Sequence, residues 1–347
     1  MVDVFRWDGK TLELPELDAV AADLKKLCAP GTARFNYTMN AVIIRHFLGG
    51  DWFRKQVHFD AHQNSYLRPN FPADSDVDPK YSVQILELAE MLTNLQFVRG
   101  FHKVLEHLSL EQIESGIAEL KVGQALTEKG IPFKYAEDTD RTTVDIIFNA
   151  PDGSQALCEI KCKKDSTPFS RNTVGSAFKE ASGQIGKGNA GILFIRVPAS
   201  WIEIEQSHAS ERAAITIPPE LIEVTRDNIR QYSRIKKVIL YVWSYAYDAD
   251  WGLSSTHNTM EFNNPRNAPP WDVELLGAYE PGDWYSLIRM GERWAKEGMN
   301  ATEDDKQLAP EDAARRRDEV IKRMLATPPQ PRVQPVKKGR KKASRPS

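Results

Sequence analysis

The segment from Thr142 to Lys163 constrains the fold more than any other part of the chain. Two apolar runs, Thr142–Asn149 and Gln155–Lys163, flank the turn sequence Ala150-Pro151-Asp152-Gly153-Ser154. Proline and glycine preset the backbone dihedrals that a tight turn requires. The segment therefore predicts a β-hairpin. Its second strand is too apolar on one face to be expected at the edge of a sheet.

The elements around this hairpin predict a mixed α/β fold. Ser109 and Gln112 resemble a capping box that opens a helix running to about Lys129. The apolar patterns then predict, in chain order, the strand Ile131–Tyr135, the hairpin, the helix Val174–Ile185 and the strands Ala190–Val197 and Lys237–Tyr245. This order predicts a mixed central sheet flanked by helices over residues 109–250.

Three further regions surround this predicted core, because 347 residues exceed what one hydrophobic core usually organises. Residues 1–108 have helical apolar spacing and are expected to form an N-terminal lobe. Residues 251–326 predict an irregular extension with helices at Trp284–Glu297 and Glu311–Leu325. Residues 327–347 have basic residues, no acid and little apolar content, so we expect a disordered basic tail.

Composition and charge exclude several classes of protein. A hydrophobic content of 41% excludes a wholly disordered chain. The net charge is −2, and removing the seven basic residues of the tail leaves −9, so any basic surface for nucleic acid must be local. Three scattered cysteines do not make a disulfide framework, the apolar runs are too short to span a membrane, and the charged N-terminus is unlike a signal peptide. We therefore expect a cytoplasmic protein.

The strand Leu157–Lys163 carries charged residues on one face. Because side chains alternate along a strand, Glu159 and Lys161 point the same way. A plausible hairpin register brings Asp145 next to Glu159. Two carboxylates about 4 Å apart repel by about 4 kcal/mol at an effective dielectric of 20. A divalent cation relieves this repulsion, and carboxylates with water suit Mg²⁺ or Mn²⁺. Glu119, beside the sheet-facing side of its helix, is placed to reach the same pocket.

These residues resemble a known group of enzymes. Helical Glu119, then Asp145, then Glu159-Ile160-Lys161 is similar to the PD-(D/E)xK phosphodiesterase superfamily, which includes restriction endonucleases, Holliday-junction resolvases and repair exonucleases. The resemblance covers roughly residues 109–197 and implies a restriction endonuclease-like core of the order α-β-β-β-α-β. It implies that Asp145 and Glu159 bind the metal and that the backbone carbonyl of Ile160 adds a ligand. Lys161 matches the residue that orients or activates the attacking water.

Other positions match the superfamily more loosely. Gln184 resembles a glutamine found in some branches, and Glu119 would add a catalytic carboxylate and metal ligand. Val144 stands where the motif often has a proline, although that proline is commonly absent. Three lysines are expected to contact nucleic acid: Lys163, Lys164 and Lys187.

The function that the resemblance implies is a Mg²⁺-dependent DNA endonuclease-like phosphodiesterase acting in restriction, phage defence or repair. DNA is favoured over RNA as the partner, and no membrane is involved. A homodimer is one possible oligomeric state. The alternative from another class is a non-catalytic nuclease-fold module that binds nucleic acid or protein. An unrelated α/β protein with a coincidental match is the third interpretation.

Each residue of the motif also has a plain structural interpretation. Glu159 and Lys161 can form an ion pair on the sheet, Asp145 can accept hydrogen bonds from backbone donors at a strand end, and Glu119 can be solvated. His58 and His62 have a metal-like spacing, but a surface role is favoured because no further ligand is identifiable nearby. Four aromatic residues are expected to fill the core rather than stack on bases: Trp243, Tyr245, Tyr247 and Trp251.

Overall fold

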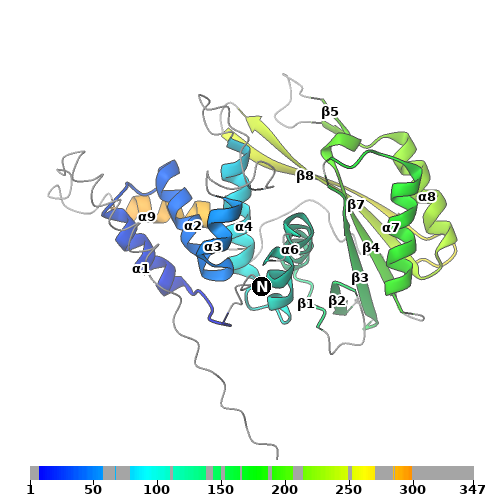
Figure 1. Ribbon diagram of the computed structural model, residues 1–347, viewed down its shortest axis with the longest axis horizontal. Coiled ribbons are helices and arrows are strands. Elements are labelled where there is room, and N and C mark those ends of the chain that lie inside the picture. Colours follow the sequence, from blue (N-terminus) through cyan, green and yellow to red (C-terminus); the bar gives the residue numbers. More distant parts are fainter. Residues whose placement is uncertain are drawn as a thin grey trace, which may run out of the picture. The chain divides into compact units, whose positions relative to one another are not determined.

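Figure 1 shows the computed structural model of this chain. The structure describes residues 8–57, 67, 79–109, 112–137, 144–149, 153–164, 166–186, 190–205, 214–248, 252–269, 284 and 286–298. The predicted basic tail, the predicted helix Glu311–Leu325 and the histidine pair at 58 and 62 lie outside these residues.

A six-stranded mixed sheet holds the hairpin that the sequence predicts, so the α/β class is confirmed (Figure 1). The strand order is β1-β2-β3-β4-β7-β8, in which β3, β4 and β7 run parallel and the other neighbours pair antiparallel. The strands of this sheet are β1 (Phe133–Tyr135), β2 (Ile146–Asn149), β3 (Gln155–Cys162), β4 (Ala190–Val197), β7 (Ile235–Asp248) and β8 (Gly252–Asn263). Two short strands, β5 (Glu203–Glu205) and β6 (Ala214–Thr216), pair separately.

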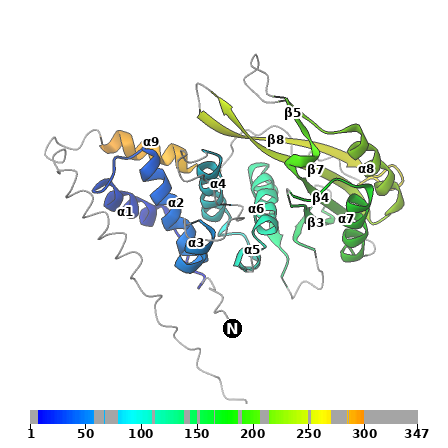
Figure 2. The same cartoon turned by 45° about the horizontal axis from the view of Figure 1, so that its top comes forward.

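Alternate residues of β3 enter two different apolar clusters. Cys158 and Ile160 belong to the cluster that includes α6 (Ile113–Glu128), whereas Leu157 belongs to the cluster that includes α7 (Arg171–Gln184) and α8 (Pro219–Gln231). Figures 1 and 2 place α6 on one face of the sheet and α7 with α8 on the other. The predicted alternation along β3 is therefore confirmed, and β3 is buried on both faces.

The remaining helices pack on one another and share the α6-side core of the sheet. They are α1 (Leu14–Lys25), α2 (Ala33–Leu48), α3 (Gly50–Gln56), α4 (Pro79–Leu95), α5 (Phe101–Ser109) and, from the other end of the chain, α9 (Leu287–Gly298). The Trp294 ring of α9 meets the Phe35 ring of α2 edge-on, with 5.8 Å between centroids. Leu88 of α4 lies in the same apolar cluster as Ile160 of β3. In the described residues the N-terminal helices thus have no core separate from the sheet.

The predicted start of α6 is wrong. Ser109 is the last residue of α5, and its hydroxyl donates to the backbone oxygen of Leu105 at 2.8 Å. Because this back-bond uses the hydroxyl inside a helix, Ser109 cannot cap the next one. Gln112 occupies the N-cap of α6 without a capping hydrogen bond from its side chain.

The predicted end of the core at residue 250 is also wrong. β8 pairs with β7 from Lys237 opposite Asn263 to Asp248 opposite Gly252, so the sheet continues into the predicted extension. β8 contains several serine, threonine and asparagine residues, and such an edge strand has no apolar run to reveal it. The apolar patterns predict no helix between β4 and β7, yet α8 lies there, with Pro218 at its N-cap and Pro219 in its first turn.

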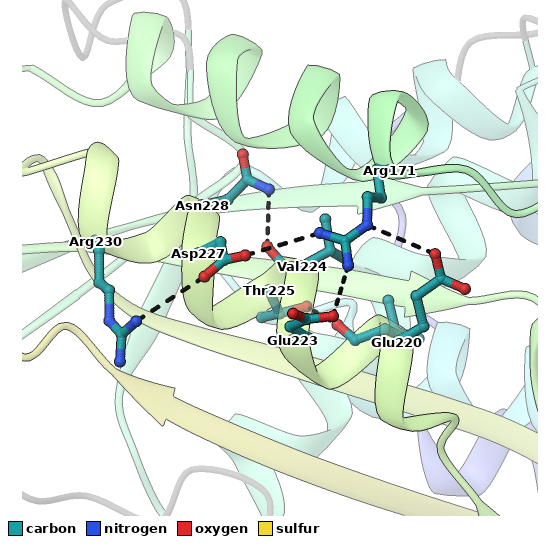
Figure 3. A network of polar contacts seen from close by, with 9 residues as sticks. Arg171, Glu220, Glu223, Val224, Thr225, Asp227, Asn228 and Arg230 are labelled. Carbon is teal, nitrogen blue, oxygen red and sulfur yellow. Dashed lines mark hydrogen bonds and ion pairs between the residues drawn. The ribbon is translucent and has the colours of Figure 1, made fainter.

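A surface ion network joins α7 to α8 (Figure 3). The guanidinium of Arg171, at the start of α7, lies 2.5 Å from a carboxylate oxygen of Glu223, 3.6 Å from Glu220 and 3.8 Å from Asp227. These side chains are about half exposed, and such pairs contribute only about 0–1 kcal/mol each. The network therefore contributes little to stability.

None of the described helices combines the length and apolar character needed to cross a membrane.

Candidate active site

Asp145 lies immediately before β2 and contacts the backbone of β3 twice. Its amide donates to the carbonyl of Cys158 at 3.0 Å, and its carboxylate oxygen Oδ2 accepts from the amide of Ile160 at 2.7 Å. Its own carbonyl accepts from the amide of Ala136 at 2.9 Å. These two contacts with β3 join Asp145 to the residues on either side of Glu159. The predicted hairpin register, which brings Asp145 next to Glu159, requires such contacts.

Glu159 and Lys161 meet on the α7 face of β3. The Lys161 ammonium Nζ lies 2.9 Å from Glu159 Oε1 and donates to Gln184 Oε1 at 2.9 Å. It also lies 3.4 Å from an oxygen of Glu180. The structure thus brings Gln184, from the end of α7, to the lysine. Glu180 was not predicted, although it lies one helical turn before Gln184.

Burial and mutual repulsion perturb both carboxylates. The side chain of Glu159 is only 2% exposed, and burial raises its pKa to about 6 despite the opposing charge of Lys161. Burial also raises the pKa of Asp145 well above its usual value, and the negative charges of Glu119 and Glu159 raise it further. Burial lowers the pKa of Lys161, but the surrounding acids Glu159, Glu180 and Asp145 together outweigh it, so this pKa is raised. The lysine therefore remains charged beside acids that are held close together.

Glu119 of α6 is near the other two acids but has its own partner. Its side chain is 7% exposed, and Oε1 lies 2.8 Å from Nδ1 of His107 in α5. Its charge raises the pKa of both Asp145 and Glu159, so it belongs to the same electrostatic environment. The expectation that Glu119 is solvated is wrong. Sequence reasoning missed His107, because nothing local signals a pairing between two separate helices.

The three lysines expected to contact nucleic acid have different surroundings. Lys163 is half-buried and Lys164 is exposed, both just after the end of β3, whereas Lys187 lies outside the described residues. Sequence reasoning missed Arg196 of β4, which pairs in register with Cys162. Its guanidinium lies 3.0 Å from Glu114 of α6 and adds a buried positive charge at the same end of the sheet.

The backbone of Ile160 faces Asp145. In a strand, the N–H and C=O of one residue point toward the same neighbouring strand. Since the amide of Ile160 points to Asp145, its carbonyl oxygen faces the same side, where β2 begins only at Ile146. A backbone oxygen thus adjoins the two carboxylates.

The donor set fits a magnesium or manganese ion. In the part of the chain that the structure describes, no three His, Cys, Asp or Glu side chains form a metal-binding group. Magnesium does not need one, because it is usually held by one or two carboxylates together with waters and substrate. Oε2 of Glu159 is buried without a hydrogen-bond partner, which is unfavourable for a carboxylate oxygen. A cation between Asp145 and Glu159 would satisfy it and relieve their repulsion.

Two contacts also agree with the plain structural interpretations. The bond from the Ile160 amide to Asp145 is a strand-end backbone contact, and Lys161 with Glu159 is an ion pair on the sheet. The aromatic side chains at positions 243, 245, 247 and 251 lie outside the described ones.

Comparison of the chain with models of known families, with curated proteins and with solved structures finds no match.

Proposed function

We propose that this protein is a divalent-metal-dependent phosphodiesterase that hydrolyses DNA, of the PD-(D/E)xK type. The observation that carries the proposal is the set of contacts joining Asp145 to the backbone of Ile160 and Lys161 to Glu159 and Gln184. Two buried carboxylates with raised pKa values beside a charged lysine are characteristic of catalytic sites.

The chain order of the elements supports this proposal. α6, β1, β2, β3, α7 and β4 follow one another as the α-β-β-β-α-β order of a restriction endonuclease-like core requires. In that order the first acid follows the turn from β1, the second acid and the lysine lie within β3, and the glutamine lies on α7. The proposed biological role of this phosphodiesterase is restriction, phage defence or repair.

Each residue has a defined task in the proposed reaction. Asp145 and Glu159, with the carbonyl of Ile160, would hold the ion, which lowers the pKa of a bound water and polarises a phosphoryl oxygen. Lys161 places a positive charge where negative charge develops on the phosphate, and it can hold the attacking water. Gln184 accepts a hydrogen bond from Lys161 and thus orients the ammonium. Lys163 and Lys164 are placed to contact neighbouring phosphates.

Cleavage of plasmid, linear, single-stranded and branched DNA with and without Mg²⁺ or Mn²⁺ tests the proposal. We expect Asp145→Asn and Lys161→Ala each to lower the metal-dependent rate by at least about a thousandfold, because each removes charge that is needed only in the reaction. The matched control is Asp23→Asn, which neutralises an exposed acid paired with Lys26 and should cleave normally. Undiminished cleavage by both site variants would refute the assignment.

Lys161 forms a direct ion pair with Glu159, as a purely structural lysine would. This contact favours a second candidate, a non-catalytic nuclease-fold module that binds nucleic acid or protein. Calorimetric titration with Mg²⁺ or Mn²⁺ separates the two. A phosphodiesterase should bind the ion with Asp145 present and lose it in Asp145→Asn, whereas a binding module should show no such difference.

A further inference from the structure

Phe97 is the most exposed of the large apolar side chains that the structure describes. It lies in the turn between α4 and α5 with 65% of its surface exposed, against 42% for Leu14 and 39% for Tyr37. Single exposed apolar residues are common on protein surfaces, so exposure alone assigns no role. The surroundings of Phe97 distinguish it.

The turn that carries Phe97 is held rigidly on both sides. The buried side-chain amide Nε2 of Gln96 donates to the carbonyls of Leu12 and Thr93 at 2.9 and 2.7 Å. Gly100 has φ +81°, a conformation that favours glycine, and any Cβ there would collide with the carbonyl oxygen of Tyr135. An aromatic ring fixed on such a turn loses little conformational freedom when a flat ligand binds to it.

The same turn lies beside the candidate active site. The carbonyl of Arg99 accepts from the amide of Tyr135 at 2.9 Å, and Tyr135 pairs with Ile146, the residue after Asp145. The turn therefore lies next to β1 as an additional strand would. With neighbouring strands about 4.8 Å apart, the backbone of Arg99 is about 10 Å from β2. This distance corresponds to about three stacked nucleotides at about 3.4 Å each.

A positive charge accompanies the ring. The side chain of Arg99 is 65% exposed, and its Nε and Nη2 donate to Glu137 at 3.1 and 2.9 Å. This leaves Nη1 of the guanidinium without a partner among the described residues. An aromatic ring and an oriented guanidinium two residues apart on one turn suit a base and a phosphate of one strand.

We propose that Phe97 is a base-stacking residue that holds a single-stranded segment of DNA beside the cleavage site, with Arg99 contacting its phosphate. The inference rests on the proposed function, because it names the form of the substrate that the same site receives. Stacking is indifferent to base identity, so Phe97 favours strand separation near the cut rather than a particular sequence.

Binding of a fluorescein-labelled single-stranded 20-mer, followed by fluorescence anisotropy in EDTA so that no cleavage occurs, tests the inference. Phe97→Ala should bind about tenfold more weakly, as expected for loss of one stacked base. Leu14→Ala, which truncates another exposed apolar side chain, is the matched control and should bind as the wild type does. Phe97→Trp should keep the affinity, and its added indole should be quenched by the oligonucleotide beyond the quenching of the eight native tryptophans.

Each result has one meaning. Equal affinity of Phe97→Ala and wild type, or no additional quenching in Phe97→Trp, overturns the stacking role even where the wild type cleaves DNA normally. A wild type that binds no single strand overturns it as well. Failure of the proposed function is a different result, since it appears as absent metal-dependent cleavage and unchanged ion binding in Asp145→Asn.

Discussion

Two buried charged clusters in this protein have the same composition, a lysine with three acids, but different surroundings. The cluster at the sheet consists of Lys161, Glu119, Asp145 and Glu159. The cluster between α4 and α6 consists of Lys121, Glu87, Glu90 and Glu128. We refer to them as the sheet cluster and the helix cluster.

The lysines of the two clusters respond differently to burial. The pKa of Lys121 is lowered, because burial outweighs the attraction of Glu87 at 3.0 Å. Burial also lowers the pKa of Lys161, but Glu159, Glu180 and Asp145 together outweigh it, so this pKa is raised. In the helix cluster the lysine mainly compensates acids between packed helices. In the sheet cluster, Asp145 keeps only a backbone donor and adjoins a backbone carbonyl. The excess of acceptor oxygens favours ion binding there, so position rather than composition distinguishes the two.

Removing the lysine of each cluster should give the largest difference in stability between the two clusters. Lys121→Ala removes the ammonium that lies 3.0 Å from the buried Glu87 carboxylate, and we expect a loss of about 3–5 kcal/mol in the free energy of unfolding. Lys161→Ala should lower that free energy by less, because the Lys161 side chain is 18% exposed, against 7% for Lys121, so water can reach the acids that it leaves. Denaturant unfolding at pH 7.5 measures both.

The control for this comparison is the double variant Lys121→Met with Glu87→Leu. Replacing a buried ion pair by apolar side chains of similar volume is often neutral, so its stability should return to within about 1–2 kcal/mol of wild type. Equal losses for Lys121→Ala and Lys161→Ala would mean that the two lysines have the same structural role.

The second prediction concerns Glu128 and pH. Burial raises its pKa to about 7 from the usual 4.5, so the folded protein binds a proton that the unfolded chain releases between these values. Its contribution to stability is therefore present below about pH 4.5 and lost as the pH rises through 7. The full shift corresponds to about 3 kcal/mol, which partial exposure reduces to about 1–2 kcal/mol.

Glu128→Gln imitates the protonated form and can still accept the hydrogen bond from Gln124. We expect it to be more stable than wild type by that amount at pH 8 and equally stable at pH 4, as measured by denaturant unfolding. A variant that is less stable than wild type at pH 8 would show that Glu128 is needed as an anion.

The candidate site follows from the sequence to the extent that local patterns determine it. The turn at Gly153 and the alternation along β3 fix which residues face each other, so the neighbourhood of Asp145, Glu159 and Lys161 was predictable. The partners supplied by other helices were not. His107 and Glu180 reach the site through the packing of α5 and α7, which no spacing in the chain encodes.

In the fold as well, elements with a clear local pattern were predictable and others were not. β4 begins and ends where its apolar run predicts, at Ala190 and Val197. β8 was missed because most of its residues are polar and it is held by backbone pairing with β7, with apolar packing only near its end at Met260 and Phe262. α8 was not predicted, although Pro219 at its start is favourable in the first turn of a helix.

The smallest expected effect compares the outer contacts of the two lysines. Glu180 is 57% exposed and lies 3.4 Å from Lys161, so Glu180→Gln should change the free energy of unfolding by less than about 0.5 kcal/mol. The matched variant Glu87→Gln, with a side chain 13% exposed, removes the closest acid of Lys121 and should be several times more destabilising. Denaturant unfolding of both proteins measures the difference. If Glu180→Gln were as destabilising as Glu87→Gln, Lys161 would depend on Glu180 as Lys121 depends on Glu87, and the sheet cluster would be a structural ion-pair network like the helix cluster.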